Sequence, residues 1–251
     1  MRIFGIYNIK GGVGKTTTTV NLAFLSAREG ARTLIWDLDP QGGTSYFLCI
    51  KPKVPGGAKA LLQGKPRPEP LVRSTGYQGL DLLPADLSYR HMDRHLTAEG
   101  MDDKAALKRF TRLLKPLSRH YDHLFLDCAP GLSAVAENVF RLSNVLLVPM
   151  LPSPLSLRAY NRLVRFLNRR PSPRLKVAPF FNLVNSDKTI HRVVIDRVLE
   201  RHPVFMRTHL PDSHVIEAMG VKRSPLFTFA PNTAEARAYR ELWEEIKGRT
   251  L

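Results

Sequence analysis

The chain has 251 residues, 43% of them apolar, which suits one large α/β domain with a buried core. Its apolar runs fall well short of the roughly 18 residues of a membrane-spanning helix and it opens without a signal-peptide pattern, so we expect a cytoplasmic protein. A net charge of +16 exceeds what an enzyme for small molecules needs, and favours nucleic acid or an acidic membrane as partner unless it is a general basic background.

Residues 8–17 read Asn-Ile-Lys-Gly-Gly-Val-Gly-Lys-Thr-Thr, between a predicted buried strand at 3–7 and a predicted helix at 18–29. This context is typical of a phosphate-binding loop, in which backbone N–H groups and the helix N-terminus surround an anion. Lys15 would then reach the β- and γ-phosphates, and the Thr16 hydroxyl would ligate Mg²⁺. The strict pattern requires glycine where Ile9 stands, and a second lysine, Lys10, precedes the glycines.

The stretch 10–16 resembles the deviant Walker A motif of the ParA/MinD family of partitioning and positioning ATPases, most closely that of the small ParA-type members. This resemblance implies a P-loop NTPase fold, ATP and Mg²⁺ as cofactors, and slow hydrolysis of ATP to ADP and phosphate that a partner stimulates. It also implies that Lys10 reaches across an ATP-dependent dimer interface and supplies charge in trans. The ATP-binding residues of the loop would be Lys10, Gly11, Gly12, Val13, Gly14, Lys15, Thr16 and Thr17.

A second predicted strand, residues 31–37, leads into Asp37-Leu38-Asp39-Pro40-Gln41-Gly42-Gly43. Carboxylates at a strand end beside a phosphate loop suit a Mg²⁺ shell or a water-positioning group, although Asp-Pro and Gly-Gly are also common in turns. The stretch resembles the family's switch I motif, Asp-x-Asp-Pro-Gln-Gly. By that match, Asp39 orients or activates the attacking water, and Asp37 and Asp39 belong to the Mg²⁺ shell.

Residues 51–79 are rich in Lys, Pro and Gly, and predict an irregular surface excursion with a short helix near 58–62. We then expect a strand at 79–84, helices at 86–98 and 102–115, the second ended by Pro116, and a strand at 121–126. The last of these leads into Asp127-Cys128-Ala129-Pro130, which has the form of a Walker B carboxylate that holds Mg²⁺ through a water. The family usually has Asp-x-Pro-Pro there, so Asp127 keeps its role and the shape of the loop is left open.

The rest of the chain predicts strands at 144–149 and 177–184, an extended segment at 204–210, and helices at 155–170, 189–201, 213–219 and 233–247. This alternation predicts an α/β fold with a mostly parallel twisted sheet, helices on both faces, one domain over 1–251 and ligands at the carboxyl ends of the strands. The resemblance extends over nearly the whole chain. It implies that Asn182 and the Pro211-Asp212 loop frame the adenine, with a plain polar strand cap as the alternative for Asn182.

The predicted helix 155–170 carries four arginines at spacings of four, three and four, namely Arg158, Arg162, Arg165 and Arg169. At about 100° per residue they lie within roughly 60° of one another, opposite an apolar face. Residues 151–210 hold 12 Lys or Arg against 3 Asp or Glu, a net +9. This concentration predicts a sequence-independent footprint on DNA, unless the face is merely solvated. Further candidates for DNA contacts are Arg192, Arg197, Lys222 and Arg223.

A membrane is the rival partner, because the MinD branch of the family ends in a basic amphipathic membrane helix. The last predicted helix here mixes glutamates with arginines and lysines, which suits anionic lipid poorly. We therefore expect an ATP-bound homodimer that binds nucleoid DNA nonspecifically and partitions or positions a chromosome, plasmid or protein assembly, with an unidentified adaptor that stimulates hydrolysis. The absence of an N-terminal helix-turn-helix segment disfavours the larger operator-binding partition type.

The second hypothesis is a metabolic P-loop enzyme, such as an ATP-dependent amidoligase or a reductase component. A reductase would need cluster-ligating cysteines. The two cysteines, Cys49 and Cys128, form neither a disulfide framework nor a metal-ligand cluster, and each is expected to be a small buried apolar residue rather than a reactive thiol. The sequence does not identify the cargo.

Overall fold

The computed structural model describes residues 1–97 and 102–250. Seven strands form one sheet in the order β3-β4-β2-β5-β1-β6-β7, and the neighbouring strands are parallel except for β3 and β4. The α/β fold with a mostly parallel sheet is thereby confirmed. The strands are β1 (Arg2–Ile6), β2 (Thr33–Asp37), β3 (Arg73–Ser74), β4 (Leu80–Leu83), β5 (His123–Asp127), β6 (Val145–Met150) and β7 (Lys176–Phe181).

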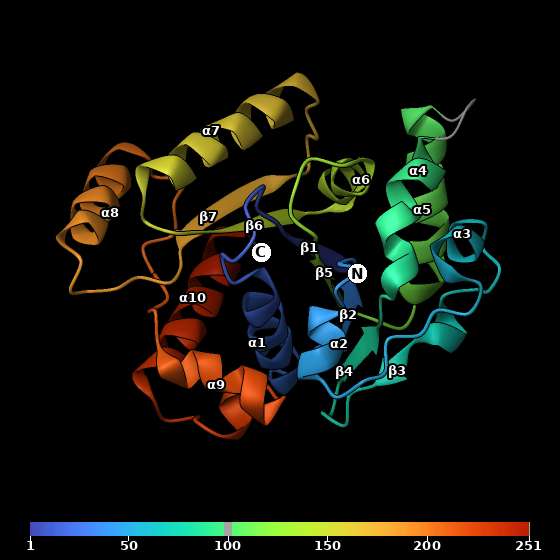
Figure 1. Ribbon diagram of the computed structural model, residues 1–251, viewed down its shortest axis with the longest axis horizontal. Helices are drawn as coiled ribbons and strands as arrows, with labels where there is room; N and C mark the ends of the chain where they lie inside the picture. The colour runs from blue at the N-terminus through green and yellow to red at the C-terminus, as the bar shows by residue number, and fades with distance from the viewer. Residues whose placement is uncertain (98–101, 251) are drawn as a thin grey trace.

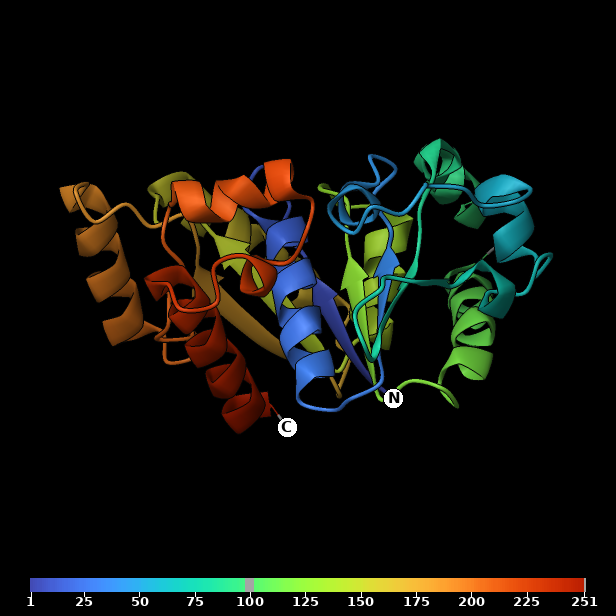
Figure 2. The same ribbon diagram turned by 90° about the horizontal axis from the view of Figure 1, so that it is seen from below.

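Helices cover both faces of the sheet, as Figures 1 and 2 show. One face is covered by α1 (Lys15–Arg28), α2 (Gly43–Phe47), α9 (His214–Lys222) and α10 (Ala234–Thr250). The other is covered by α3 (Gly57–Leu62), α4 (Met92–Leu96), α5 (Asp103–Leu117), α6 (Ala134–Leu142), α7 (Pro154–Arg169) and α8 (Thr189–Arg201). Short 3₁₀ helices lie at Glu69–Leu71, Leu87–His91 and Leu226–Thr228.

The central strands are buried on both faces, because an apolar cluster lies on each side of the sheet. On the α1 side, the Phe4 ring stacks on Phe125 with 4.8 Å between centroids, and both rings contact Trp243 of α10. Buried aromatic pairs of this kind add to the stability that burial of their area already provides. The rigid centre fixes the carboxyl ends of β1, β2 and β5, where the predicted site lies.

Several element boundaries differ from the sequence-based prediction. Helix α5 continues through Pro116 to Leu117, since a proline in the last turn removes only one backbone hydrogen bond. The helix predicted at 86–98 is a 3₁₀ turn followed by the short α4, and its final residue, 98, lies outside the described residues. Helix α6 has no counterpart in the prediction, although the Ser133 side chain caps it by accepting from the Ala136 N–H.

The segment 204–210 runs beside β7 without forming a strand. Its amides reach β7 at only two points, from Met206 to the Pro179 carbonyl and from Leu210 to the Phe181 carbonyl. Between them, the amides of Arg207 and Thr208 donate to the Glu245 carboxylate of α10. A glutamate side chain therefore accepts the hydrogen bonds that a neighbouring strand would accept. The apolar pattern of the segment cannot indicate this.

The segment 51–79, expected as an irregular excursion, is partly ordered and well packed. It contains α3 as well as β3, which pairs antiparallel with β4 at the edge of the sheet. Its apolar side chains enter the core on the α5 side, among them Val54, Leu61 and Leu71. None of the helices in the described parts of the chain is both long enough and apolar enough to cross a membrane.

Candidate nucleotide site

The loop between β1 and α1 depends on glycine at two positions. Gly12 and Gly14 have φ values of +69° and +79°, in the left-handed region that glycine adopts at low cost. At Gly14 space is also decisive, because a Cβ there would lie 2.2 Å from the Asn182 Nδ2 atom. The backbone can therefore turn sharply and expose the N–H groups at the start of α1, which is the geometry of an anion cradle.

Two buried asparagine side chains hold this loop in place. The Asn8 amide donates to the Pro149 carbonyl at 2.7 Å, and its oxygen accepts from the Lys10 N–H. Asn182, which directly follows β7, donates to the Val13 carbonyl at 2.8 Å. Both side chains are almost fully buried. Asn182 thus lies against the phosphate loop. No local sequence pattern indicates either contact, because each joins residues more than 140 positions apart.

Lys15 lies inside the loop rather than in solvent. Its ammonium group donates to the Lys10 carbonyl at 3.1 Å, and burial lowers its pKa, an effect that the Asp127 carboxylate counters. A buried cation next to unpaired backbone N–H groups would bind a phosphate chain strongly, since the low local dielectric strengthens the interaction. The side chain of Lys10 is only half-buried, and the neighbouring Gly11 and Gly12 are exposed.

Sheet register places two acidic side chains together at the carboxyl edge. Asp37 of β2 lies directly opposite Asp127 of β5, and both are completely buried. The Asp127 carboxylate accepts from the Thr44 hydroxyl at 2.7 Å, and Asp37 accepts from the Asp39 N–H at 3.1 Å and the Ser45 N–H at 3.3 Å. Hydroxyl and amide groups from α2 and from the loop that precedes it therefore fix both carboxylates.

The two carboxylates have perturbed acidities because they are buried near each other. Burial raises the pKa of Asp127 to about 6, although hydrogen bonds from the Thr44 and Thr16 hydroxyls counter part of that rise. Burial also raises the pKa of Asp37 well above its usual range, and the Asp127 charge adds to the effect. Buried like charges of this kind favour a nearby cation.

These residues fit a Mg²⁺ ion that is shared with a nucleotide. The donor set consists of carboxylate and hydroxyl oxygens, which Mg²⁺ prefers. In residues 1–97 and 102–250, no three His, Cys, Asp or Glu side chains gather closely enough to form a complete metal site. Mg²⁺ would therefore take its other ligands from phosphate and water oxygens, as is usual where it accompanies a nucleotide.

Asp39 lies in the loop after β2, half-buried. Its carboxylate accepts from the Gln41 N–H at 2.9 Å, and its carbonyl accepts from the Gly42 N–H, so the loop is a tight turn that leads into α2. Gly43 is close to the phosphate loop, since a Cβ there would lie 3.1 Å from the Thr16 Cγ2 atom. The structure therefore brings the Asp39 turn against Thr16.

The Pro211-Asp212 loop lies next to the end of β7. Pro211 forms an isolated parallel bridge with Val184, and the Asp212 N–H donates to the Val184 carbonyl at 2.9 Å. Asp212 is exposed and Pro211 half-buried, so the loop is accessible at the same edge of the sheet as Asn182.

The two cysteines have different environments. Cys128 is buried next to Asp127, and burial raises the pKa of its thiol far above its usual range, so it is a small core residue as expected. For Cys49 the expectation of burial was wrong. It is exposed just after α2 with a left-handed φ of +56°, and its Sγ lies 3.5 Å from the Arg223 carbonyl oxygen.

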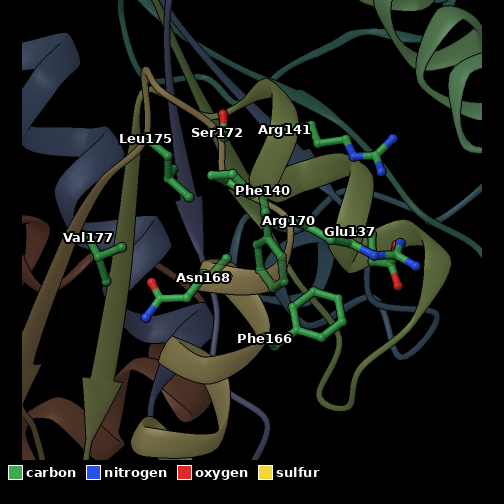
Figure 3. A pocket seen from close by; sticks show the side chains of 11 residues that line it. Glu137, Phe140, Arg141, Phe166, Asn168, Arg170, Ser172, Leu175 and Val177 are labelled. Carbon is green, nitrogen blue, oxygen red and sulfur yellow. The ribbon is translucent and has the colours of Figure 1, made fainter.

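The four arginines of α7, here called the α7 ridge (Arg158, Arg162, Arg165 and Arg169), are all exposed. On the opposite side of the helix, Tyr160 and Leu163 are buried in the core. None of the four forms an ion pair within the described ranges, whereas the adjacent Arg170 pairs with Glu137 and Asp103. Figure 3 shows Arg170 and Glu137 beside a cavity of about 180 Å³ between α6 and α7, too small for a nucleotide.

The other basic candidates fall into two groups. Arg192 and Arg197 are exposed on α8, which packs into the same core as α7. Lys222 and Arg223 lie at the end of α9, on the opposite face of the sheet (Figure 1). The Arg223 guanidinium stacks over the Tyr46 ring at 4.6 Å and donates to the Tyr46 carbonyl. The structure therefore does not bring Lys222 and Arg223 together with the α7 ridge.

A parallel sheet, a glycine loop before α1, a buried lysine and two strand-end carboxylates define the class of P-loop nucleotide hydrolases. A family model described as an AAA domain matches residues 1–176. Chromosome-partitioning ATPase Soj of Thermus thermophilus is 31% identical over 99% of this chain and 96% of its own length. The chain belongs to the ParA/MinD family of ATPases.

Solved structures show the same architecture. Cobyrinic acid a,c-diamide synthase from Mycobacterium smegmatis, with bound ATP analog and magnesium, has a TM-score of 0.78 at 26% identity, over 97% of this chain and 93% of that one. Apo McdA from Cyanothece has a TM-score of 0.82 at 21% identity, over 98% and 99% of the two chains. The second likeness concerns the fold alone.

Proposed function

We propose that the protein is a Mg²⁺-dependent ATPase whose ATP-bound homodimer binds DNA without sequence preference and so partitions or positions a cellular cargo. The observation that carries this proposal is the α7 ridge, an exposed row of arginines without ion-pair partners in the described chain. The phosphate loop and the family membership account for ATP binding and hydrolysis but not for this ridge. Exposed guanidinium groups on one helix face match the phosphate backbone of DNA.

In this proposal the residues of the site have separate tasks. Lys15 and the loop N–H groups neutralise phosphate charge, while Thr16, Asp37 and Asp127 hold Mg²⁺. When bound, the ion supplies positive charge to the phosphates. Asp39 orients the attacking water, and the accessible Lys10 reaches the nucleotide of the second subunit. Asn182 supports the phosphate loop, and the Pro211-Asp212 loop borders the adenine.

Association with the nucleoid in the cytoplasm, slow turnover and stimulation by a cargo adaptor complete the proposal. A membrane partner is disfavoured by α10, whose apolar side chains are used in the core. Tyr239, Leu242, Trp243 and Ile246 are all buried there. A helix without a free apolar face cannot insert into a lipid interface.

The test uses a ridge variant in which Arg158, Arg162, Arg165 and Arg169 are replaced by Glu. With a slowly hydrolysed ATP analogue and Mg²⁺, we expect its affinity for unrelated duplexes to fall at least about tenfold, with a shallower salt dependence. ATPase activity and dimerisation should persist, because the packed side of α7 is unchanged. A control with the same charge change, Arg28→Glu, Lys51→Glu, Lys53→Glu and Arg237→Glu, should bind like the wild type. Undiminished binding by the folded ridge variant would show that the ridge is only a solvated face.

A metabolic enzyme is the second candidate, favoured by the likeness to the diamide synthase over nearly all of both chains. An ATP-dependent amidoligase would hydrolyse ATP only with its acceptor and would have no need of the α7 ridge. Cosedimentation with plain plasmid DNA in the presence of ATP separates the two candidates. ATP-dependent cosedimentation supports the positioning ATPase, and its absence supports the ligase.

A further inference from the structure

A second row of exposed cations follows the outer side of α5. These residues, called the α5 row, are Lys104, Lys108, Arg112, Lys115 and Arg119, and all five are exposed. Spacings of four, four and three place Lys104 to Lys115 on one side of α5, and Arg119 lies in the turn that follows the end of the helix at Leu117. On the other side, Phe110, Leu113 and Leu114 are buried in the core. The helix is therefore fixed by its apolar side and presents a rigid line of positive charge.

The α5 row is not neutralised by neighbouring acids that the structure describes. In residues 1–97 and 102–250, none of the five cations forms an ion pair. The acidic residue that begins α5, Asp103, pairs instead with Arg141 and Arg170. Arg112 differs slightly from the others, since it donates weakly to the Leu62 carbonyl at 3.5 Å and lines a cavity of about 250 Å³ together with Glu69.

The row is long enough to contact several phosphates of one duplex. At 1.5 Å per residue, Lys104 and Lys115 lie about 16 Å apart along the α5 axis, with a cation roughly every 6 Å, and Arg119 lies just beyond the end of the helix. Duplex DNA carries one negative charge about every 1.7 Å of its axis, so a straight row of this length can lie beside several phosphates on one face of the duplex. A lipid surface is a poorer match, because four of the five large apolar side chains of α5, all but the half-buried Leu107, are in the core and cannot insert.

The α5 row and the α7 ridge approach each other at one end and diverge from there. At that end Arg170, which follows the ridge residue Arg169, pairs with Asp103, which precedes Lys104. Asp103 also pairs with Arg141, and Arg170 with Glu137. In Figure 1, α7 and α5 run in different directions. A single straight duplex therefore cannot lie along both helices.

We propose that the α5 row is a second surface that binds the phosphate backbone of duplex DNA without sequence preference, so that the protein joins two duplexes. Binding at α5 is independent of the α7 ridge. The joining of two duplexes rests on the proposed function, since the first duplex is held by the ridge. A protein with two such surfaces would link two DNA segments, in addition to binding along one.

The test compares the full chain with an α5 variant, in which Lys104, Lys108, Lys115 and Arg119 are replaced by Glu. Arg112 is left in place because of its contact below the helix. One duplex is attached to beads, and a second, fluorescent duplex of unrelated sequence is added with Mg²⁺ and a slowly hydrolysed ATP analogue. We expect the wild type and the control quadruple variant to capture the fluorescent duplex. The α5 variant should bind the beads but lose most of the capture, and wild-type capture should weaken steeply with salt.

Unchanged capture by the α5 variant would overturn the inference. The inference would also be overturned if the α5 variant captured DNA normally but no longer bound vesicles of anionic phospholipid, since the partner would then be a membrane. A failure of the proposed function would be seen in a different experiment. There, the ridge variant would bind a single duplex with undiminished affinity. If charge reversal prevents folding by circular dichroism, the neutral variant with Gln at the same four positions gives the same comparison.

Discussion

At the carboxyl edge of the sheet, Asp37, Asp127 and Lys15 are buried and hydrogen-bonded, whereas the arginines of α7 are exposed and have no ion-pair partner in the described chain. A charge in a buried site interacts strongly with its neighbours, because water does not screen it. Charges on a helix surface are screened, so each contributes little and their effect comes from several acting together. Single substitutions should therefore be decisive at the carboxyl edge and mild on the ridge.

The largest effect is expected at Lys15. Replacement by Ala removes the buried cation of the phosphate loop, so ATP binding should be lost, with affinity lowered by about 100-fold or more. Titration calorimetry with ATP and Mg²⁺ measures this directly. The exposed Lys51→Ala is the matched control and should bind normally. Normal affinity in Lys15→Ala would refute the assignment of the loop.

Asp39→Ala should separate binding from chemistry. Loss of a group that orients water should slow hydrolysis by about 10²- to 10⁴-fold, while ATP binding and dimerisation persist. Phosphate release and light scattering measure the two properties on the same sample. Since Asp39 also accepts from the Gln41 N–H, Asp39→Asn tests whether the turn alone is responsible. Hydrolysis at the wild-type rate in both variants would leave Asp39 as a turn residue only.

Lys10→Ala should leave ATP binding by the monomer nearly intact but weaken the ATP-dependent dimer by about 10- to 100-fold, because a charge-assisted contact across the interface is lost. Sedimentation velocity with a slowly hydrolysed ATP analogue reports the dimer. Lys10→Arg retains the charge and should restore part of the association. Dimers of unchanged stability in Lys10→Ala would show that this side chain does not act in trans.

The raised pKa of Asp127, about 6, predicts how Mg²⁺-dependent binding responds to pH. Above pH 7 the carboxylate is ionised and can hold the cation, and below pH 6 it becomes protonated. The gain in nucleotide affinity from Mg²⁺ should therefore fall about tenfold between pH 7.5 and pH 5. Asp127→Asn should reduce this dependence to the part that Asp37, whose pKa is also raised, contributes. A gain that stays constant over the range would mean that Asp127 does not contribute to the Mg²⁺ site.

The smallest effect is expected for single changes on the ridge. Arg165→Ala should weaken DNA binding by less than about fivefold, because exposed charges contribute little one at a time. Its slope of log affinity against log salt should become shallower by about 0.9, one counterion per lost phosphate contact. Filter binding at several salt concentrations measures both. If Arg165→Ala lost as much DNA affinity as the ridge variant, Arg165 would make a specific contact, and the ridge would not act through the combined charge of its four arginines.

Much of this protein could be predicted from local patterns. The phosphate loop was recognisable because its glycines, Lys15 and Thr16 are consecutive, and Gly12 and Gly14 indeed have left-handed φ values. The exposure of the arginines on α7 followed from their spacing alone, and the range of α8 agrees residue for residue. These features depend on a few neighbouring residues and on the periods of helix and strand.

Only the tertiary structure decided the features that join distant segments. The pairing of Asp37 with Asp127 depends on sheet register, and the contact of Asn182 with Val13 joins residues 169 positions apart. In the segment 204–210, Glu245 accepts from two amides that a strand would pair with β7. The α5 row is distinct from the α7 ridge because the two helices run in different directions. A sequence shows which residues are apolar, which favour turns and which carry charge. The partners that satisfy their hydrogen bonds and charges are set by tertiary packing.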